Sequence, residues 1–120
     1  QEAWARLAVR DRLRPVRALR DLLVVWADDL LAAVRADVGR PAVEVLATEL
    51  LPAAAAIKFL EKEAARVLAP RTIPGRLRPT WLFGCRDVVH RRPWGAVGVI
   101  GTWNYPVFLN VGPIAAALVA

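Results

Sequence analysis

Apolar residues recur at steps of three and four along residues 3–35, which predicts a helical region. One apolar stripe consists of Leu19, Leu22, Leu23, Trp26, Leu30 and Val34. A proline costs about 3 kcal/mol in a helix interior. We therefore expect a break or kink near Pro15, with residues 3–13 as a separate short helix.

A second helical region is expected after the sequence Gly39-Arg40-Pro41. Glycine suits the left-handed position that follows a helix, and proline suits the first turn of the next one. Residues 42–51 should continue as helix, and Pro52 should bend or restart it. The buried face beyond this proline is predicted to consist of Ile57, Leu60, Ala64, Val67 and Leu68. We expect the helix to end near Leu68.

The helical pattern is lost over the next part of the chain. Several prolines and a glycine make residues 69–79 an irregular linker. A short apolar run at residues 81–83 and a weakly alternating run at residues 88–92 then flank turn residues 84–87. This order predicts a β-hairpin over residues 80–92.

The last part of the chain, residues 93–120, predicts a strand, a turn and a helix. Residues 96–100 are uniformly apolar and lie between two glycines, which is typical of a strand buried on both faces of a parallel sheet. Gly101 permits a sharp turn. We expect a helix to begin within two residues of Pro106 and to kink at Pro113. The predicted fold class is therefore α/β, with an N-terminal helical layer leading through the hairpin into a parallel sheet.

Asn104 is the most informative residue of the predicted turn. Asparagine is a good helix N-cap, so its side chain can simply begin the following helix. A carboxamide also has two N–H donors and no charge, and can donate to an oxygen that becomes negative during acyl or hydride chemistry. Both interpretations remain open on the local pattern.

The stretch over residues 95–106, ending in Gly-Thr-Trp-Asn-Tyr-Pro, resembles the first signature of the aldehyde dehydrogenase superfamily. With Pro113 seven residues on, it is similar to the subfamily acting on medium-chain and aromatic aldehydes. The resemblance implies that Asn104 is the oxyanion-hole asparagine. It also implies that Ile100, Gly101, Thr102 and Trp103 line the cleft for NAD or NADP.

The resemblance implies more for the chain as a whole. In the family, a cysteine thiolate attacks the aldehyde, and a glutamate activates the water that releases the acid. Both groups are expected outside this chain, so the isolated 120 residues should be an inactive N-terminal part of a longer enzyme. The parallel sheet should be that of the cofactor domain, and residues 80–92 should be an arm that meets a partner subunit in a homo-oligomer. The sequence Gly39-Arg40-Pro41 is similar to the family's Gly-Lys-Pro, with arginine in place of lysine.

Composition leaves one alternative function open. The net charge is +6, and arginines are densest over residues 6–20. Such a balance is compatible with a non-catalytic helical interaction module that binds acidic partners. The remaining basic residues are scattered, which favours solvated faces over nucleic-acid binding. One cysteine suits a reducing cytoplasm, and residues 93–120 are broken too often by glycine and proline for a transmembrane segment.

Other titratable residues have no partners at convincing spacing. Cys85 is expected to be a bystander, since the family's catalytic cysteine lies in a different context. His90 has no second ligand nearby in sequence, so no metal site is predicted. The helix carboxylates, expected to be solvated, are Glu44, Glu49, Glu61 and Glu63.

Overall fold

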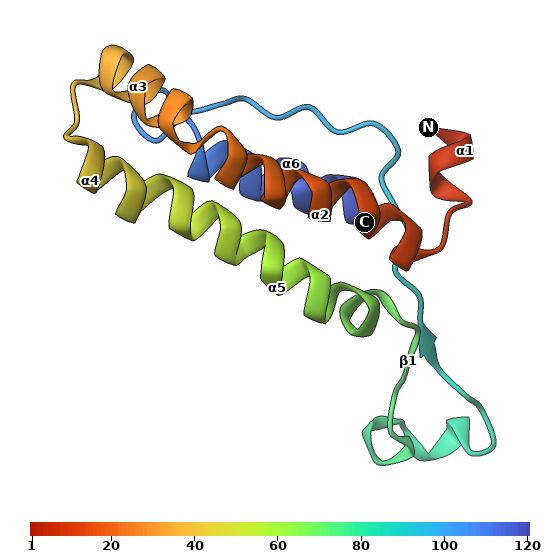
Figure 1. Ribbon diagram of the computed structural model, residues 1–120. Coiled ribbons are helices and arrows are strands. Elements are labelled where there is room, and N and C mark those ends of the chain that lie inside the picture. Colours follow the sequence, from red (N-terminus) through yellow and green to blue (C-terminus); the bar gives the residue numbers. More distant parts are fainter.

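The computed structural model describes residues 1–120 and is mostly helical (Figure 1). The α-helices are α1 (Glu2–Ala5), α2 (Val9–Val25), α3 (Ala27–Val38), α4 (Ala42–Val45), α5 (Leu51–Leu68) and α6 (Phe108–Val119). A π-helical turn, η1 (Leu46–Leu50), joins α4 to α5. Two short 3-10 helices are η2 (Gly75–Leu77) and η3 (Thr80–Leu82). The one sheet has two strands, β1 (Arg71–Thr72) and β2 (Val88–Val89).

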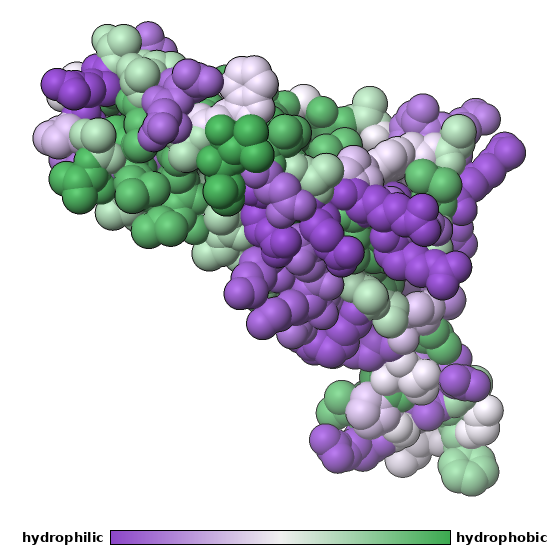
Figure 2. Space-filling view, in the orientation of Figure 1, coloured by the Kyte–Doolittle hydropathy of each residue, from purple (hydrophilic) through white to green (hydrophobic).

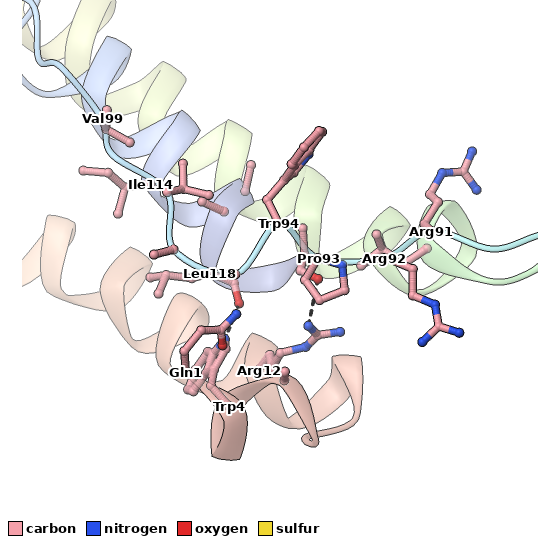
Figure 3. A pocket seen from close by; sticks show the side chains of 18 residues that line it. Gln1, Trp4, Arg12, Arg91, Arg92, Pro93, Trp94, Val99, Ile114 and Leu118 are labelled. Atoms are coloured by element: carbon pink, nitrogen blue, oxygen red, sulfur yellow. Dashed lines mark hydrogen bonds between the residues drawn. The ribbon is translucent and has the colours of Figure 1, made fainter.

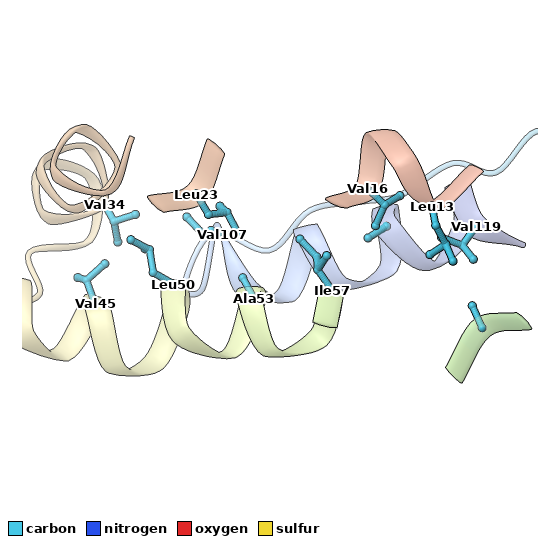
Figure 4. Close-up of a cluster of buried hydrophobic side chains, with 12 residues drawn as sticks. Leu13, Val16, Leu23, Val34, Val45, Leu50, Ala53, Ile57, Val107 and Val119 are labelled. Carbon is cyan, nitrogen blue, oxygen red and sulfur yellow. The ribbon is translucent and has the colours of Figure 1, made fainter. Parts of the chain in front are cut away.

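Three helices form the body of the molecule. α2, α5 and α6 lie side by side along its length, and α3 and α4 extend one end (Figure 1). Their facing sides enclose one apolar core (Figure 4). Its buried residues are Leu13, Val16, Leu23, Val34, Val45, Leu50, Ala53, Ile57, Ala64, Val107, Ala115 and Val119. The core therefore joins the N-terminal helices to the last helix of the chain.

The prediction of a helix break near Pro15 is wrong. Pro15 lies inside α2, and the chain instead breaks after α1 and at Trp26, between α2 and α3. Leu13 and Val16 on either side of the proline are buried in the core. Their packing explains why the helix continues through a residue that removes one backbone hydrogen bond. Because of the second break, the expected stripe divides: Leu23 and Val34 are buried, whereas Trp26 is exposed.

The predicted stop at Gly39 is confirmed. Gly39 has φ 74° and ψ 14°, and its backbone N–H donates to the carbonyl of Arg35. Pro41 is the N-cap of α4. Pro52 lies at the start of α5, directly after the π-helical turn, so the helix is adjusted where proline removes a donor. α5 ends at Leu68, as expected.

We predict that Gly39→Ala lowers the free energy of unfolding of the complete protein by about 1–2 kcal/mol, because Cβ is unfavourable at a left-handed position. No atom lies within 4 Å of the position of an added Cβ, so the cost should come from the backbone alone. Gly112→Ala is the matched control. Gly112 lies inside α6 with equal space, and its substitution should stabilise by about 0.5–1 kcal/mol. Denaturant unfolding of both variants measures this, and equal effects would contradict the assignment.

The hairpin has a different pairing from the one predicted. β1 pairs antiparallel with β2, with Arg71 opposite Val89 and Thr72 opposite Val88. The expected strand at residues 81–83 is instead mostly the 3-10 helix η3, which follows Pro79. The hairpin therefore begins within the expected linker, and residues 73–87 form its long connection. It projects from the helical body (Figure 1).

The expected buried strand at residues 96–100 is wrong for this chain. These residues are irregular and exposed, with Ile100 98% accessible. A strand needs a neighbour to satisfy its backbone N–H and C=O groups. The two-stranded sheet is formed elsewhere in the chain, and no parallel sheet is present. The helix that follows is confirmed, since α6 begins at Phe108, two residues after Pro106.

Hydrophobic and hydrophilic side chains lie on different parts of the surface of the helical body. Figure 2 shows hydrophobic side chains gathered over α4 and the adjoining start of α5, and hydrophilic ones over the half of α5 nearest the hairpin. The exposed apolar residues in the first of these regions include Val43, Leu46 and Leu51. None of the helices combines the length and apolarity required to cross a bilayer.

Candidate functional site

Asn104 lies in an exposed turn directly before α6. Its side chain does not cap that helix: the N-cap position is Val107, and it has no side-chain cap hydrogen bond of its own. The cap interpretation of Asn104 is therefore wrong in this structure. The carboxamide stands at the surface with its donors directed to no helix terminus.

Asn110, in the first turn of α6, forms hydrogen bonds with both ends of the segment that contains Asn104. Its Oδ1 accepts from the backbone N–H of Thr102 at 3.0 Å, and its Nδ2 donates to the carbonyl of Pro106 at 2.8 Å. An added Cβ at Gly101 would lie 3.1 Å from this side chain. A side chain at position 101 would therefore crowd Asn110, and the φ of Gly101 is not positive. The two ends of the turn are joined through one carboxamide.

Glu49 forms hydrogen bonds with the C-terminal end of the same segment, where α6 begins. Its Oε2 accepts from the backbone N–H groups of Val107 and Phe108, both at 2.9 Å. The first N–H groups of a helix have no partner within the helix, so a carboxylate at this end satisfies them and interacts favourably with the helix dipole. Glu49 is 0% exposed. The expectation that it is solvated is therefore wrong.

A signal for Glu49 was present in the sequence. It falls at four-residue steps between Val45, Ala53 and Ile57, all of which are buried. A carboxylate that interrupts an apolar stripe must find partners when buried. Those partners are backbone groups 58 and 59 residues away in sequence, so the pattern alone does not identify them.

Arg40 connects Glu49 to the residue beside Asn104. Its guanidinium carbon lies 3.8 Å from the centre of the Tyr105 ring. Its NH1 lies 3.9 Å from Oε1 of Glu49, and its Nε lies 3.7 Å from Glu44. A planar guanidinium can stack on an aromatic ring while it faces a carboxylate, which a lysine ammonium does less well. Arg40 is thus part of the packing around the turn.

The four expected cofactor residues precede Asn104 and are all exposed. Ile100 is 98% and Trp103 is 81% accessible, so both present apolar surface to solvent. Thr102 is held by Asn110, and its Oγ1 donates to the carbonyl of Tyr105 at 3.3 Å. The structure brings these residues together with Asn104 on one exposed segment.

A groove near the C-terminal end of α6 is separate from this exposed segment. It encloses about 820 Å³ between α1, the C-terminal half of α6 and residues 91–99. Figure 3 shows Trp4, Trp94 and Leu118 around it, with a hydrogen bond of 2.8 Å from Trp4 Nε1 to the carbonyl of Leu118. Asn104 precedes the opposite end of α6, so this groove contributes no residue to the candidate site.

The remaining candidates do not join the site. Cys85 is an exposed free thiol in the hairpin connection, and His90 is exposed beyond β2. The chain contains no group of three or more His, Cys, Asp or Glu residues that could hold a metal ion. Glu61, expected to be solvated, lies 2.8 Å from Arg20 and 3.8 Å from Arg17. Much of the arginine-rich surface is thus paired with carboxylates.

A family model described as the aldehyde dehydrogenase family matches residues 1–120. The chain belongs to the aldehyde dehydrogenase family. The match covers the helical body, the hairpin and the Asn104 turn alike. The chain is thus part of an aldehyde dehydrogenase domain, and this part is mostly helical with a small two-stranded sheet.

Several aldehyde dehydrogenases and an aldehyde oxidase are similar to this chain. It is 36% identical over 112 residues to a probable coniferyl aldehyde dehydrogenase of Pseudomonas aeruginosa, covering 91% of this chain and 22% of that protein. It is 32% identical over 117 residues to a 4,4'-diapolycopene aldehyde oxidase of a Methylomonas species, covering 98% and 22%. It is 30% identical over 120 residues to a putative NADP(+) succinate-semialdehyde dehydrogenase of Mycolicibacterium smegmatis, covering 100% and 22%. The chain thus spans 22% of the length of each of these relatives.

Proposed function

We propose that this chain is the N-terminal part of an NAD(P)-dependent enzyme that oxidises an aldehyde to a carboxylic acid. Asn104 would be its oxyanion-hole donor. The observation that carries this role is the exposed carboxamide of Asn104 on a turn whose two ends are hydrogen-bonded to Asn110 and Glu49. A donor that is held in place but not used by the fold is what electrostatic stabilisation of a developing charge requires.

The chemistry assigned to this chain is the stabilisation of one negative charge. A cysteine thiolate outside the chain would add to the aldehyde carbon, and the carbonyl oxygen of the resulting thiohemiacetal would carry the charge. The carboxamide of Asn104 would donate an N–H to that oxygen without a change in its own protonation. The isolated chain would then bind no transition state and remain inactive.

The residues before Asn104 fit a nicotinamide cofactor. Ile100 and Trp103 present exposed apolar surfaces on either side of Gly101 and Thr102. A flat ring that carries an amide suits such a surface. The bound cofactor would supply the hydride acceptor. Ile100, Gly101, Thr102 and Trp103 would hold it beside the aldehyde and exclude water from that side.

The complete protein provides the test. It should reduce NAD or NADP in the presence of an aldehyde, and a panel of medium-chain and aromatic aldehydes with both cofactors covers the substrates suggested by the Gly-Thr-Trp-Asn-Tyr-Pro sequence. Succinate semialdehyde and coniferyl aldehyde belong in the panel because relatives carry those names. Absorbance of the reduced cofactor reports the reaction. No reduction with any aldehyde would contradict the proposal.

We also propose that residues 80–92 belong to an arm that contacts a partner subunit. Trp81 is 81% and Phe83 is 98% exposed on a hairpin that projects from the body. Tryptophan and phenylalanine are enriched at protein interfaces relative to the rest of the protein surface.

Replacing Trp81 and Phe83 by serine should therefore weaken assembly of the complete protein. Interface aromatic residues often contribute 2 kcal/mol or more, so the dissociation constant should rise by at least about 30-fold. Sedimentation of the variant beside the parent measures this. Phe59→Ser, at a 60% exposed position on α5, is the control and should leave the assembly unchanged. A parent protein that sediments as a monomer would refute the arm assignment.

The alternative of a non-catalytic basic module is not favoured. The family match includes the Asn104 turn and α6, which such a module does not require. Arg14, Arg17 and Arg20 lie near carboxylates rather than forming a free basic face.

A further inference from the structure

The position of Asn104 depends on residues that flank it, because its own side chain is exposed and caps no helix. On the N-terminal side, Thr102 is tied to Asn110. On the C-terminal side, the chain is held at Val107 and Phe108 by Glu49. Asn104 is two residues from the first of these contacts and three residues from the second. Any movement of the start of α6 is therefore expected to move the carboxamide.

The Glu49 contact has the features of a strong anchor. One carboxylate oxygen accepts two backbone N–H groups at 2.9 Å in a fully buried position. Hydrogen bonds to an ionised acceptor are stronger than those between neutral groups. Val107 is itself buried in the core, so side-chain packing and the carboxylate hold the same residue. The start of α6 therefore has little freedom.

Arg40 completes this anchor. A buried carboxylate is costly unless its charge is balanced. Oε1 of Glu49 has no hydrogen-bond partner, and the nearest cation is NH1 of Arg40 at 3.9 Å. The same guanidinium lies over the Tyr105 ring, next to Asn104 in sequence. One side chain thus balances the anchoring charge and packs against the turn.

Both anchoring residues come from the segment between α3 and α5. Arg40 follows the left-handed Gly39, and Glu49 lies in the π-helical turn η1. Single π-helical turns inside α-helices often occur at functional sites. Here the turn contains the carboxylate that accepts from the start of α6.

We propose that Glu49 and Arg40 are positioning residues for the oxyanion donor: they hold the turn so that the carboxamide of Asn104 keeps one place. This inference rests on the proposed role of Asn104. Neither residue touches the substrate in this proposal: Glu49 acts through the backbone of Val107 and Phe108, and Arg40 acts through the Tyr105 ring. Their loss should lower the chemical step and leave cofactor binding nearly unchanged.

The test is a double-mutant cycle in the complete enzyme. Glu49→Gln keeps the size of the side chain and removes its charge. It should lower kcat by about 10- to 100-fold, since small displacements of a catalytic group have effects of that size. KM for the cofactor should change less than about twofold. In the Asn104→Ala background the same substitution should have almost no further effect on kcat, because residues that act as a unit are not additive.

Two further variants keep the test decisive. Glu63→Gln is the matched control: this carboxylate pairs with Arg66 on the surface of α5, and its loss should leave kcat unchanged. Arg40→Lys keeps the charge and removes the stacked plane over Tyr105, and it should lower kcat by about 2- to 5-fold. If Glu49→Gln does not fold, Arg40→Lys takes its place in the cycle with Asn104→Ala.

The possible failures are distinguishable. In one outcome, Asn104→Ala lowers kcat, and Glu49→Gln lowers kcat by the same factor in the Asn104→Ala variant as in the parent enzyme. The positioning role is then overturned, while the role of Asn104 stands. If Asn104→Ala leaves kcat unchanged, the role of Asn104 falls and the positioning role falls with it. The inference is supported if Glu49→Gln lowers kcat of the parent enzyme but does not change kcat of the Asn104→Ala variant.

Discussion

Asn104→Ala should lower turnover of the complete enzyme by about 100- to 1000-fold, which is the usual effect of removing one oxyanion donor. The carboxamide would meet a charged oxygen only along the reaction path, so its loss should appear in kcat far more than in cofactor binding. Steady-state kinetics with a good aldehyde and varied cofactor separate the two effects. Thermal stability should change little, since the side chain is exposed and caps no helix.

Asn104→Asp distinguishes this role from helix capping. Aspartate would place negative charge against the oxyanion, so it should be at least as harmful as alanine. Aspartate is as good a helix cap as asparagine, and a capping role would leave the variant nearly silent. The structure already assigns the free N–H groups at the start of α6 to Glu49. Near-normal turnover in Asn104→Asp would end the oxyanion assignment.

Ile57→Ala should destabilise the complete protein by about 2–5 kcal/mol, the usual range for truncation of a buried isoleucine. Ile57 is 0% exposed and lies in the core between α2, α5 and α6. Ile57→Val should cost about 0.5–1.5 kcal/mol, because it removes one methyl group and leaves a smaller cavity. Denaturant unfolding of the two variants beside the parent measures the series.

The neighbouring Lys58→Ala is the control for helix propensity. Lys58 is exposed on α5, and its substitution should change the free energy of unfolding by less than about 0.5 kcal/mol. An Ile57→Ala variant no less stable than Lys58→Ala would show that the three-helix core is not the one described.

Asn110 and Glu49 explain why the candidate site was only half predictable. Asn104, Ile100, Gly101, Thr102 and Trp103 follow one another in the chain, so a local motif indicates them together. Asn110 is close in sequence, but its two hydrogen bonds depend on how the turn folds back over α6. Glu49 is 58 residues from Val107, and no local pattern relates them. Recognition of a buried carboxylate in an apolar stripe would have pointed to Glu49 without naming its partner.

The secondary-structure predictions that are wrong also failed because distant parts of the chain decide the outcome. Residues 96–100 have the composition of a buried strand, but a strand exists only where a neighbour completes its hydrogen bonds. Residues 81–83 are apolar, but Trp81 and Leu82 lie in the 3-10 helix η3, and β2 pairs with β1 instead. Pro15 disfavours a helix locally, and burial of Leu13 and Val16 outweighs it. Each outcome depends on residues outside the segment concerned.

The sequence by itself determined the features whose causes are local: the helix stop at Gly39, the end of α5 at Leu68, the start of α6 after Pro106 and the signature around Asn104. Left-handed glycine, proline in a first turn and helical periodicity act within a few residues, so they can be read along the chain. Only the tertiary structure decided which strands pair, that α2 runs through Pro15, and that Glu49 and Arg40 meet the Asn104 turn. Those outcomes arise from burial and hydrogen bonding between segments far apart in sequence, where the free energy of the whole arrangement overrides local preference.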